Sequence, residues 1–137
     1  MTTREAQNKA IARRFFEASD AELLAPDLVV HFPGAPAPLN REALLQELSM
    51  FNAAFSDTHI MVEDQIAEGD KVATRVTWRG TQSGNFQGLP PTGKQIAMGA
   101  IIVQRIKEGK ILEHWPLFDL MGMMQQLGLV APPQPSR

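Results

Sequence analysis

Asp119 is the residue of this sequence whose position most strongly suggests chemistry. It lies where a strand-like run ends and a short apolar helix begins, directly after Trp115, Leu117 and Phe118. Charged side chains are rarely buried in such surroundings unless a partner or a function holds them there. The carboxylate can act as a general acid/base in a pocket, or it can simply be the N-cap of the helix that follows. The pattern around Asp119 leaves both roles open.

Three other side chains share a strand face with Asp119. If the strand is regular, Glu113, Trp115, Leu117 and Asp119 alternate with residues on the opposite face. We therefore expect Trp115 and its neighbours on this face to line a pocket. On the same reasoning, His114 is expected to face solvent or a subunit interface.

His31 is the second candidate for a catalytic role. It lies in a short β-rich run, residues 28–32, which ends at the proline-rich loop 33–38. Histidine is the side chain best suited to proton transfer near neutral pH. The alternative is that His31, beside Phe32, is only a hydrogen-bonded residue at a sheet edge. We keep both interpretations.

Composition excludes several classes of function. The 137 residues carry a net charge of −2 and include no cysteine, and the lysines and arginines are scattered. Nucleic acid is therefore not an expected partner. The three histidines are too far apart in the sequence for a metal motif. No apolar run approaches the roughly 18 residues of a membrane span. We expect one cytoplasmic domain over residues 1–137, with no metal, cofactor or membrane partner.

Two amphipathic helices are predicted in the first half of the chain. One covers about residues 3–19, and the second begins at the N-cap residue Asn40 and covers about 40–55. Phe15 and Phe51 fall on their apolar faces. Core packing explains both phenylalanines, and both are also candidates for the wall of a substrate pocket.

From residue 57 onward the apolar pattern changes to a period of two. Runs near 57–68, 71–79, 95–106 and 110–117 are joined mainly by tight turns and predict an antiparallel meander. Helices followed by a meander indicate an α+β fold, in which a curved sheet wraps over the helices and leaves an internal pocket. An outer sheet face that carries Trp78 or isoleucine and valine residues needs cover, so we expect a homodimer or higher oligomer.

Several segments resemble the SnoaL-like polyketide cyclase family of the NTF2-like superfamily. These are the glycine-rich stretch 80–93, the run 109–115, Asp119 and the Gln-Leu-Gly ending 126–128. The resemblance covers nearly the whole chain and implies the NTF2-like cone. In that family an aspartate at the end of the last strand is the general acid/base of an intramolecular aldol condensation, without cofactor. By its position, Asp119 is that residue.

The resemblance is incomplete at two positions. Ile102 and Gln82 stand where the family often carries histidines. Ile102 is then expected in the pocket wall as an apolar residue. Loss of a donor to a developing oxyanion typically costs about 10²-fold in rate, so the implied aldol chemistry would be weakened.

Three functions remain open. The first is a cofactor-independent lyase or isomerase that closes a ring in a small hydrophobic carbonyl compound, with Asp119 and His31 as catalytic residues. The second is a protein of the same fold that binds such a compound without turnover. The third is an epoxide or ester hydrolase, which would need a second carboxylate and an arginine such as Arg75 in the pocket. The residues predicted to bind substrate are Trp115, Phe15, Leu117, Phe51, Ile102 and Glu113.

Overall fold

The computed structural model describes residues 3–131 of the chain. The predicted α+β class is confirmed, and the two long helices agree closely with their predicted bounds. Strand β1 begins earlier than expected, because its first residues already pair with β5. In chain order the elements are α1 (Arg4–Ala18), the 3₁₀ turn η1 (Ala21–Leu23), β1 (Leu24–Val30), α2 (Arg41–Ala54), β2 (Phe55–Glu68), β3 (Lys71–Gln82), β4 (Gln95–Lys107), β5 (Lys110–Phe118) and α3 (Leu120–Gln126).

The long helices begin where their capping side chains place them. Thr3 Oγ1 accepts a hydrogen bond from the Ala6 N–H at 3.0 Å, and Asn40 Oδ1 accepts one from the Ala43 N–H at 3.1 Å. Each bond satisfies a donor that has no partner inside the helix. The Asn40 cap is the local signal from which the start of the second helix was predicted.

The five strands form one sheet in the order β1-β5-β4-β3-β2. Strands β2 to β5 are antiparallel neighbours, as predicted, whereas β1 pairs parallel to β5. The β4–β5 turn is tight, since Glu108 and Gly109 both have left-handed backbones, with φ values of 52° and 78°. The turn pairs Ile106 with Ile111, and a register shift of one residue then pairs Arg105 with Glu113. The turn and this bulge together decide which side chains of β5 point inward.

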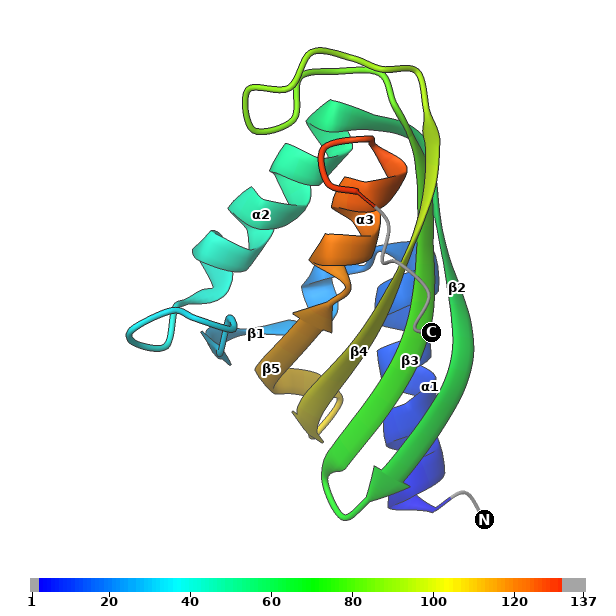
Figure 1. Cartoon of the computed structure of the whole chain (residues 1–137). Coiled ribbons are helices and arrows are strands. Elements are labelled where there is room, and N and C mark those ends of the chain that lie inside the picture. Colours follow the sequence, from blue (N-terminus) through cyan, green and yellow to red (C-terminus); the bar gives the residue numbers. More distant parts are fainter. Residues whose placement is uncertain (1–2, 132–137) are drawn as a thin grey trace, which may run out of the picture.

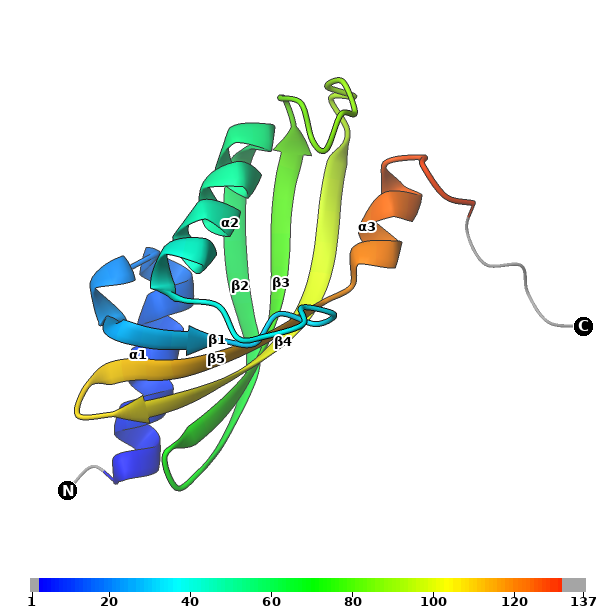
Figure 2. The same ribbon diagram turned by 90° about the vertical axis from the view of Figure 1, so that its left-hand side faces the viewer.

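The sheet is strongly curved, and the two long helices lie on its concave side (Figures 1 and 2). In Figure 2, β2 and β3 stand upright, whereas β5 and β1 run across the view below α2. The main core lies between the helices and the sheet, as the predicted cone requires. Its buried residues are Ala12, Phe15, Phe16, Leu24, Leu28, Val30, Leu44, Val72, Val76, Ala100, Ile102, Ile106 and Ile111.

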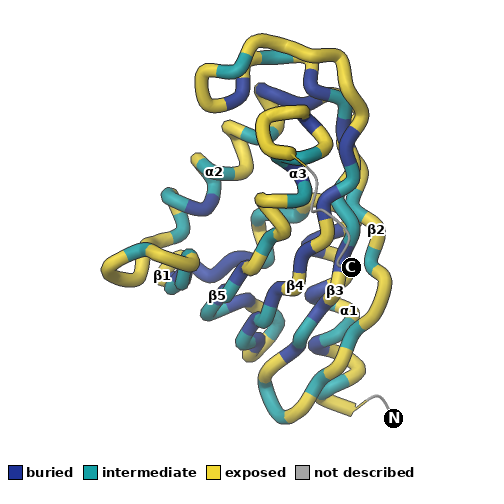
Figure 3. Tube along the Cα trace, viewed as in Figure 1, coloured by how far each residue is buried: buried dark blue, intermediate teal, exposed yellow. Residues whose placement is uncertain are grey.

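The outer face of the sheet carries exposed apolar side chains. Ile101 and Leu117 are direct cross-strand partners and are 50% and 61% exposed. Strand β2 is exposed or half-buried along most of its length (Figure 3). Trp78, expected on the outer face, instead packs against Phe51 on the inner face. The reason is the period of two, which places Trp78 on the same face of β3 as Val76.

The short helix α3 covers the beginning of β4. Met123 and Leu127 are buried there against Ile96 and Met98 in a second apolar cluster. This helix is held by tertiary packing, since it is too short to be stable alone. Over residues 3–131, no helix has the length and apolar character needed to cross a membrane.

Candidate active site

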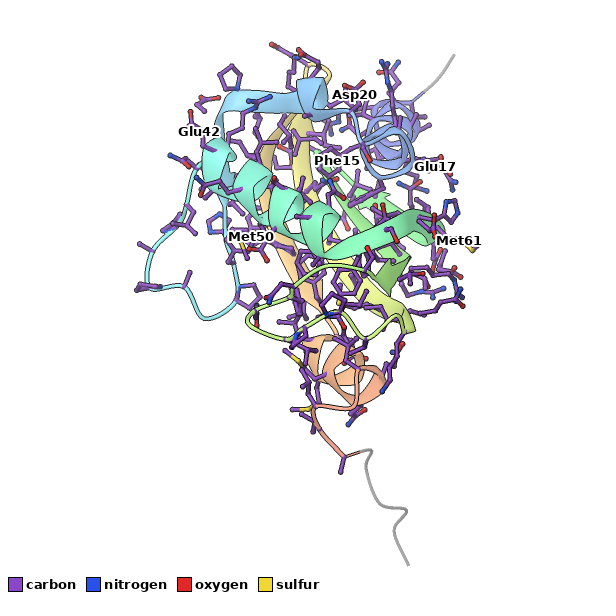
Figure 4. All side chains as sticks on the ribbon, turned by 90° about the horizontal axis from the view of Figure 1, so that it is seen from above. Phe15, Glu17, Asp20, Glu42, Met50 and Met61 are labelled. Carbon is purple, nitrogen blue, oxygen red and sulfur yellow. The ribbon has the colours of Figure 1, made fainter. Side chains whose placement is uncertain are left out.

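A cavity of about 440 Å³ lies between α1, α2 and the inner face of the sheet. This volume falls within the range of small-molecule sites. Figure 4, which looks down on the molecule, shows Phe15 in the space between α1 and α2. The deeper wall is apolar except for one histidine. Its buried members are Phe15, Phe16, Leu44, Val76, Met98, Ala100, Ile102 and His114.

The mouth of the cavity lies where α1 ends, α2 passes and β2 begins. The lining residues of this region, among them Ser49, Asn52 and His59, are exposed. Two carboxylates, Glu17 and Glu47, also belong to it, and Glu17 is 3.3 Å from Arg13. Among the described residues that line the cavity, none is lysine or arginine. The wall therefore offers no cation that could bind an anionic group.

His114 is the polar group of the deep wall. Its side chain is only 3% exposed, and burial lowers its pKa from 6.5 to about 4, because the charged ring would lose its hydration. The ring is therefore neutral near pH 7. Its Nδ1 lies 3.1 Å from Gln104 Nε2, and Phe15 packs edge-on against it at a centroid distance of 5.9 Å. A neutral imidazole offers one N–H donor and one bare nitrogen.

The structure corrects the position predicted for Asp119. This side chain is exposed and caps α3, with Oδ1 accepting a hydrogen bond from the Gly122 N–H at 2.9 Å. It does not belong to the cavity wall. A general base must come within hydrogen-bond reach of the proton that it removes. The geometry therefore supports the capping role and does not support a catalytic one.

Four further predicted site residues also lie outside the cavity. His31 stacks on Trp115 with ring centroids 4.8 Å apart, and its Nε2 is 2.9 Å from Glu113 Oε2. Glu113 in turn accepts a bond from Arg105 Nε at 2.8 Å. The Arg105 guanidinium, followed by His31, lowers the pKa of Glu113. Together with Leu117, these side chains lie on the outer face of the sheet and tie β1, β4 and β5 together.

Three of the residues predicted to bind substrate, Phe15, Phe51 and Ile102, line the cavity. The histidine of the wall was missed because the strand register is irregular. A plain count across the β4–β5 turn would pair Gln104 with Glu113, but a shift of one residue near Leu112 pairs Gln104 with His114 instead. His114 therefore shares a face with Gln104 and Ile102, and no signal in the sequence indicated this shift.

Gln82 has a structural role. Its amide nitrogen lies 3.2–3.3 Å from the carbonyl oxygens of Gly84, Leu89 and Pro90. Its Oε1 accepts bonds from the Thr92 N–H and, at 2.6 Å, from the Thr92 hydroxyl. One buried side chain thus organises the glycine-rich loop that follows β3.

The arrangement of the cavity wall offers hydrogen-bond chemistry. Within residues 3–131, no three His, Asp or Glu side chains gather in a way that could hold a metal ion. Arg75 is not part of the cavity wall either, which leaves the predicted hydrolase arrangement without its arginine. The cavity can enclose an apolar compound and offer it one neutral imidazole.

Comparison with known proteins gives concordant results. Residues 6–127 match the family model of the SnoaL-like polyketide cyclases. The chain is 32% identical over 127 residues to the aklanonic acid methyl ester cyclase DnrD of Streptomyces peucetius, covering 90% of this chain and 84% of that protein.

Solved structures share the fold. IdmH of Streptomyces antibioticus is 36% identical with a TM-score of 0.77, over 92% of this chain and 99% of that one. AclR of Streptomyces galilaeus has a TM-score of 0.86 at 24% identity, over 95% of this chain and 86% of that one. At this identity, the likeness to AclR concerns the fold alone.

Proposed function

Because the chain belongs to the SnoaL-like polyketide cyclase family, we propose that it closes a ring in a neutral, carbonyl-containing polyketide ester bound in the cavity. The observation that carries this proposal is a neutral histidine, His114, set in an otherwise apolar buried wall. A buried N–H donor is worth most where water is excluded.

The proposed reaction is an intramolecular aldol-type closure. A base removes a proton from a carbon between two carbonyl groups, and the resulting enolate carbon attacks a ketone carbon of the same molecule. The carbon–carbon bond forms as the ketone π electrons move onto oxygen, which then takes up a proton. No atom is lost and no cofactor is consumed. His114 donates a hydrogen bond to the oxygen on which negative charge develops, a contribution of about 10²–10³-fold in rate.

The apolar wall makes the second contribution. Phe15, Phe51 and Trp78 enclose the bound chain and hold its reacting carbons close together. Such positioning replaces a search among many conformers, and well-oriented intramolecular reactions gain several kcal/mol from it. Since no lysine or arginine stands among the described residues of the wall, an ester is favoured over the free acid.

Glu47 is the proposed base. Of the two carboxylates on the wall, Glu17 is ion-paired with Arg13, whereas Glu47 is half-buried on α2. A carbon flanked by carbonyls is acidic enough for a carboxylate to deprotonate it when its enolate is stabilised. Asp119 has no part in this scheme because it lies outside the cavity.

The test uses aklanonic acid methyl ester, the compound named for the relative DnrD. The wild-type protein should convert it, or a close analogue, into a product of unchanged mass and altered chromatographic retention. Ala100→Phe, which fills the cavity from β4, should abolish conversion. Ala97→Phe, the same change on the opposite face of that strand, should retain it.

Other outcomes identify the alternative functions. An ester that binds, as shown by tryptophan fluorescence, but stays unchanged would favour a binding protein. This alternative is supported by the wall itself, in which none of the described carboxylates is buried. Release of methanol and the free acid would indicate a hydrolase. Equal conversion by both phenylalanine variants would refute the cavity as the site.

A further inference from the structure

Gln104 is the hydrogen-bond partner of His114 beneath the cavity. The two residues are paired across β4 and β5, and both are buried, with Gln104 fully so. Gln104 Nε2 lies 3.1 Å from His114 Nδ1. An amide nitrogen can only donate, so Nδ1 accepts and must be bare. The single proton of the neutral ring is then on Nε2.

The orientation of the Gln104 amide follows from the cost of the alternative. As it stands, Oε1 is a buried acceptor without a partner among the described residues. If the amide were turned over, Oε1 would face the ring and accept a hydrogen bond from Nδ1–H. The amide NH₂ group would then point away from the ring, and both of its buried N–H groups would lack the ring nitrogen as an acceptor. Buried N–H groups without partners are rarer than underused carbonyl oxygens. The observed orientation is therefore the better one.

The free ring nitrogen borders the cavity. No described residue forms a hydrogen bond with His114 Nε2, and this atom is not one of the fully buried atoms without a partner. Since His114 lines the cavity and its Nδ1 is taken by Gln104, Nε2 is the nitrogen left to meet a ligand.

From these contacts we infer that Gln104 is a positioning residue, which holds His114 as the Nε2–H tautomer and so presents a hydrogen-bond donor to the cavity. Without the amide donor at Nδ1, the ring could expose a bare nitrogen instead, and a bare nitrogen repels a carbonyl oxygen. The consequence for ring closure rests on the proposed function, whereas the tautomer itself does not.

An unpaired acceptor beneath the cavity distinguishes this role from ordinary packing. A leucine or methionine at position 104 would fill the same space without leaving Oε1 unsatisfied. The unsatisfied Oε1 lowers the stability of the fold, and this cost is explained if the amide is needed to hold the His114 ring in one tautomer.

Nitrogen-15 NMR of the histidine rings near pH 7 tests the inference on the whole chain without a substrate. The His114 signals are identified by their loss in His114→Gln. In the wild type, Nε2 should carry the proton and Nδ1 should show the shift of a bare nitrogen. In Gln104→Glu, the carboxylate should accept from Nδ1, so that this nitrogen becomes protonated. In Gln104→Met, the ring should lose its single tautomer.

Two results would overturn the inference. One is a wild-type ring protonated at Nδ1, which needs no variant and so does not depend on whether one folds. The other is an unchanged Nε2–H pattern in a folded Gln104→Met protein.

Kinetics then separate this inference from the proposed function. If the wild type closes the ring, Gln104→Met should lower kcat about tenfold with little change in KM. If the wild type shows no ring closure, the proposed function fails while the tautomer result stands.

Discussion

Lowering the pH should reveal the buried, neutral state of His114 as a loss of stability. Its folded-state pKa of about 4 is below the ordinary value of 6.5, because the buried ring cannot be charged cheaply. As the pH falls, the unfolded chain therefore takes up this proton before the folded one does. Stability is unaffected by His114 above about pH 6.5 and falls between about pH 6.5 and 4.

The magnitude follows from the size of the shift. A change of pKa from 6.5 to about 4, at roughly 1.4 kcal/mol for each pH unit, destabilises the folded state by about 3 kcal/mol once both forms are protonated. Near pH 4.5 most of this loss should already be present. It is a large fraction of the 5–15 kcal/mol that holds a typical domain together.

The assay compares wild type with His114→Gln by urea unfolding near pH 7 and near pH 4.5. Glutamine can still accept the bond from Gln104 but cannot titrate. The wild type should lose about 2–3 kcal/mol more than the variant over this interval. Carboxylates with lowered pKa values, such as Glu113 and Asp70, titrate in both proteins and cancel. An equal loss in the two proteins would refute the buried, neutral histidine.

Three further outcomes are expected. Gln82→Leu removes the hydrogen bonds that organise the loop after β3. We expect the free energy of unfolding, measured by thermal denaturation, to fall by about 2–4 kcal/mol, and proteolysis within residues 83–93 to become faster. A loop that stays resistant to proteolysis would contradict this. Glu113→Gln removes a carboxylate whose pKa is lowered by Arg105. The ion pair should therefore stabilise the fold by less than about 1 kcal/mol above about pH 4.5, and this contribution should fade at lower pH and weaken in high salt. An effect of the substitution that does not depend on salt would exclude an ionic origin. We expect a second copy of the chain to cover the exposed Ile101–Leu117 pair. Sedimentation should then give about twice the chain mass of 15.1 kDa for the wild type and a single chain mass for Leu117→Lys. A monomeric wild type would disprove this.

The fold could be predicted largely because its signals are local. Asn40 and the apolar faces of the helices set α1 and α2, and the alternation along β3 and β4 set the strands. The parallel pairing of β1 with β5 could not be foreseen in the same way. It joins residues such as Val30 and His114, which are far apart in the sequence and share no turn.

The site was predicted less well, for reasons of geometry. Asp119 satisfies the sequence requirements of both a helix cap and a general base, and only its direction separates the two. The strand face that carries Trp115 was chosen because it contained Asp119, whereas the β4–β5 register places the opposite face inward. For the same reason His114 was predicted to face solvent or a subunit interface, whereas it lines the cavity. Ile102, which the family resemblance placed in the pocket wall, does line the cavity.

The most direct test of the account compares two variants in a single-turnover assay of ring closure. Asp119→Asn keeps an N-cap of nearly equal strength, so its stability should stay within roughly 1 kcal/mol of wild type. Its rate should stay within about twofold, because Asp119 lies outside the cavity. His114→Gln should slow ring closure by about 10²-fold, since the neutral imidazole donor is lost. The reverse pattern, a slow Asp119→Asn and an unimpaired His114→Gln, would contradict the account and return catalysis to the carboxylate at the end of β5.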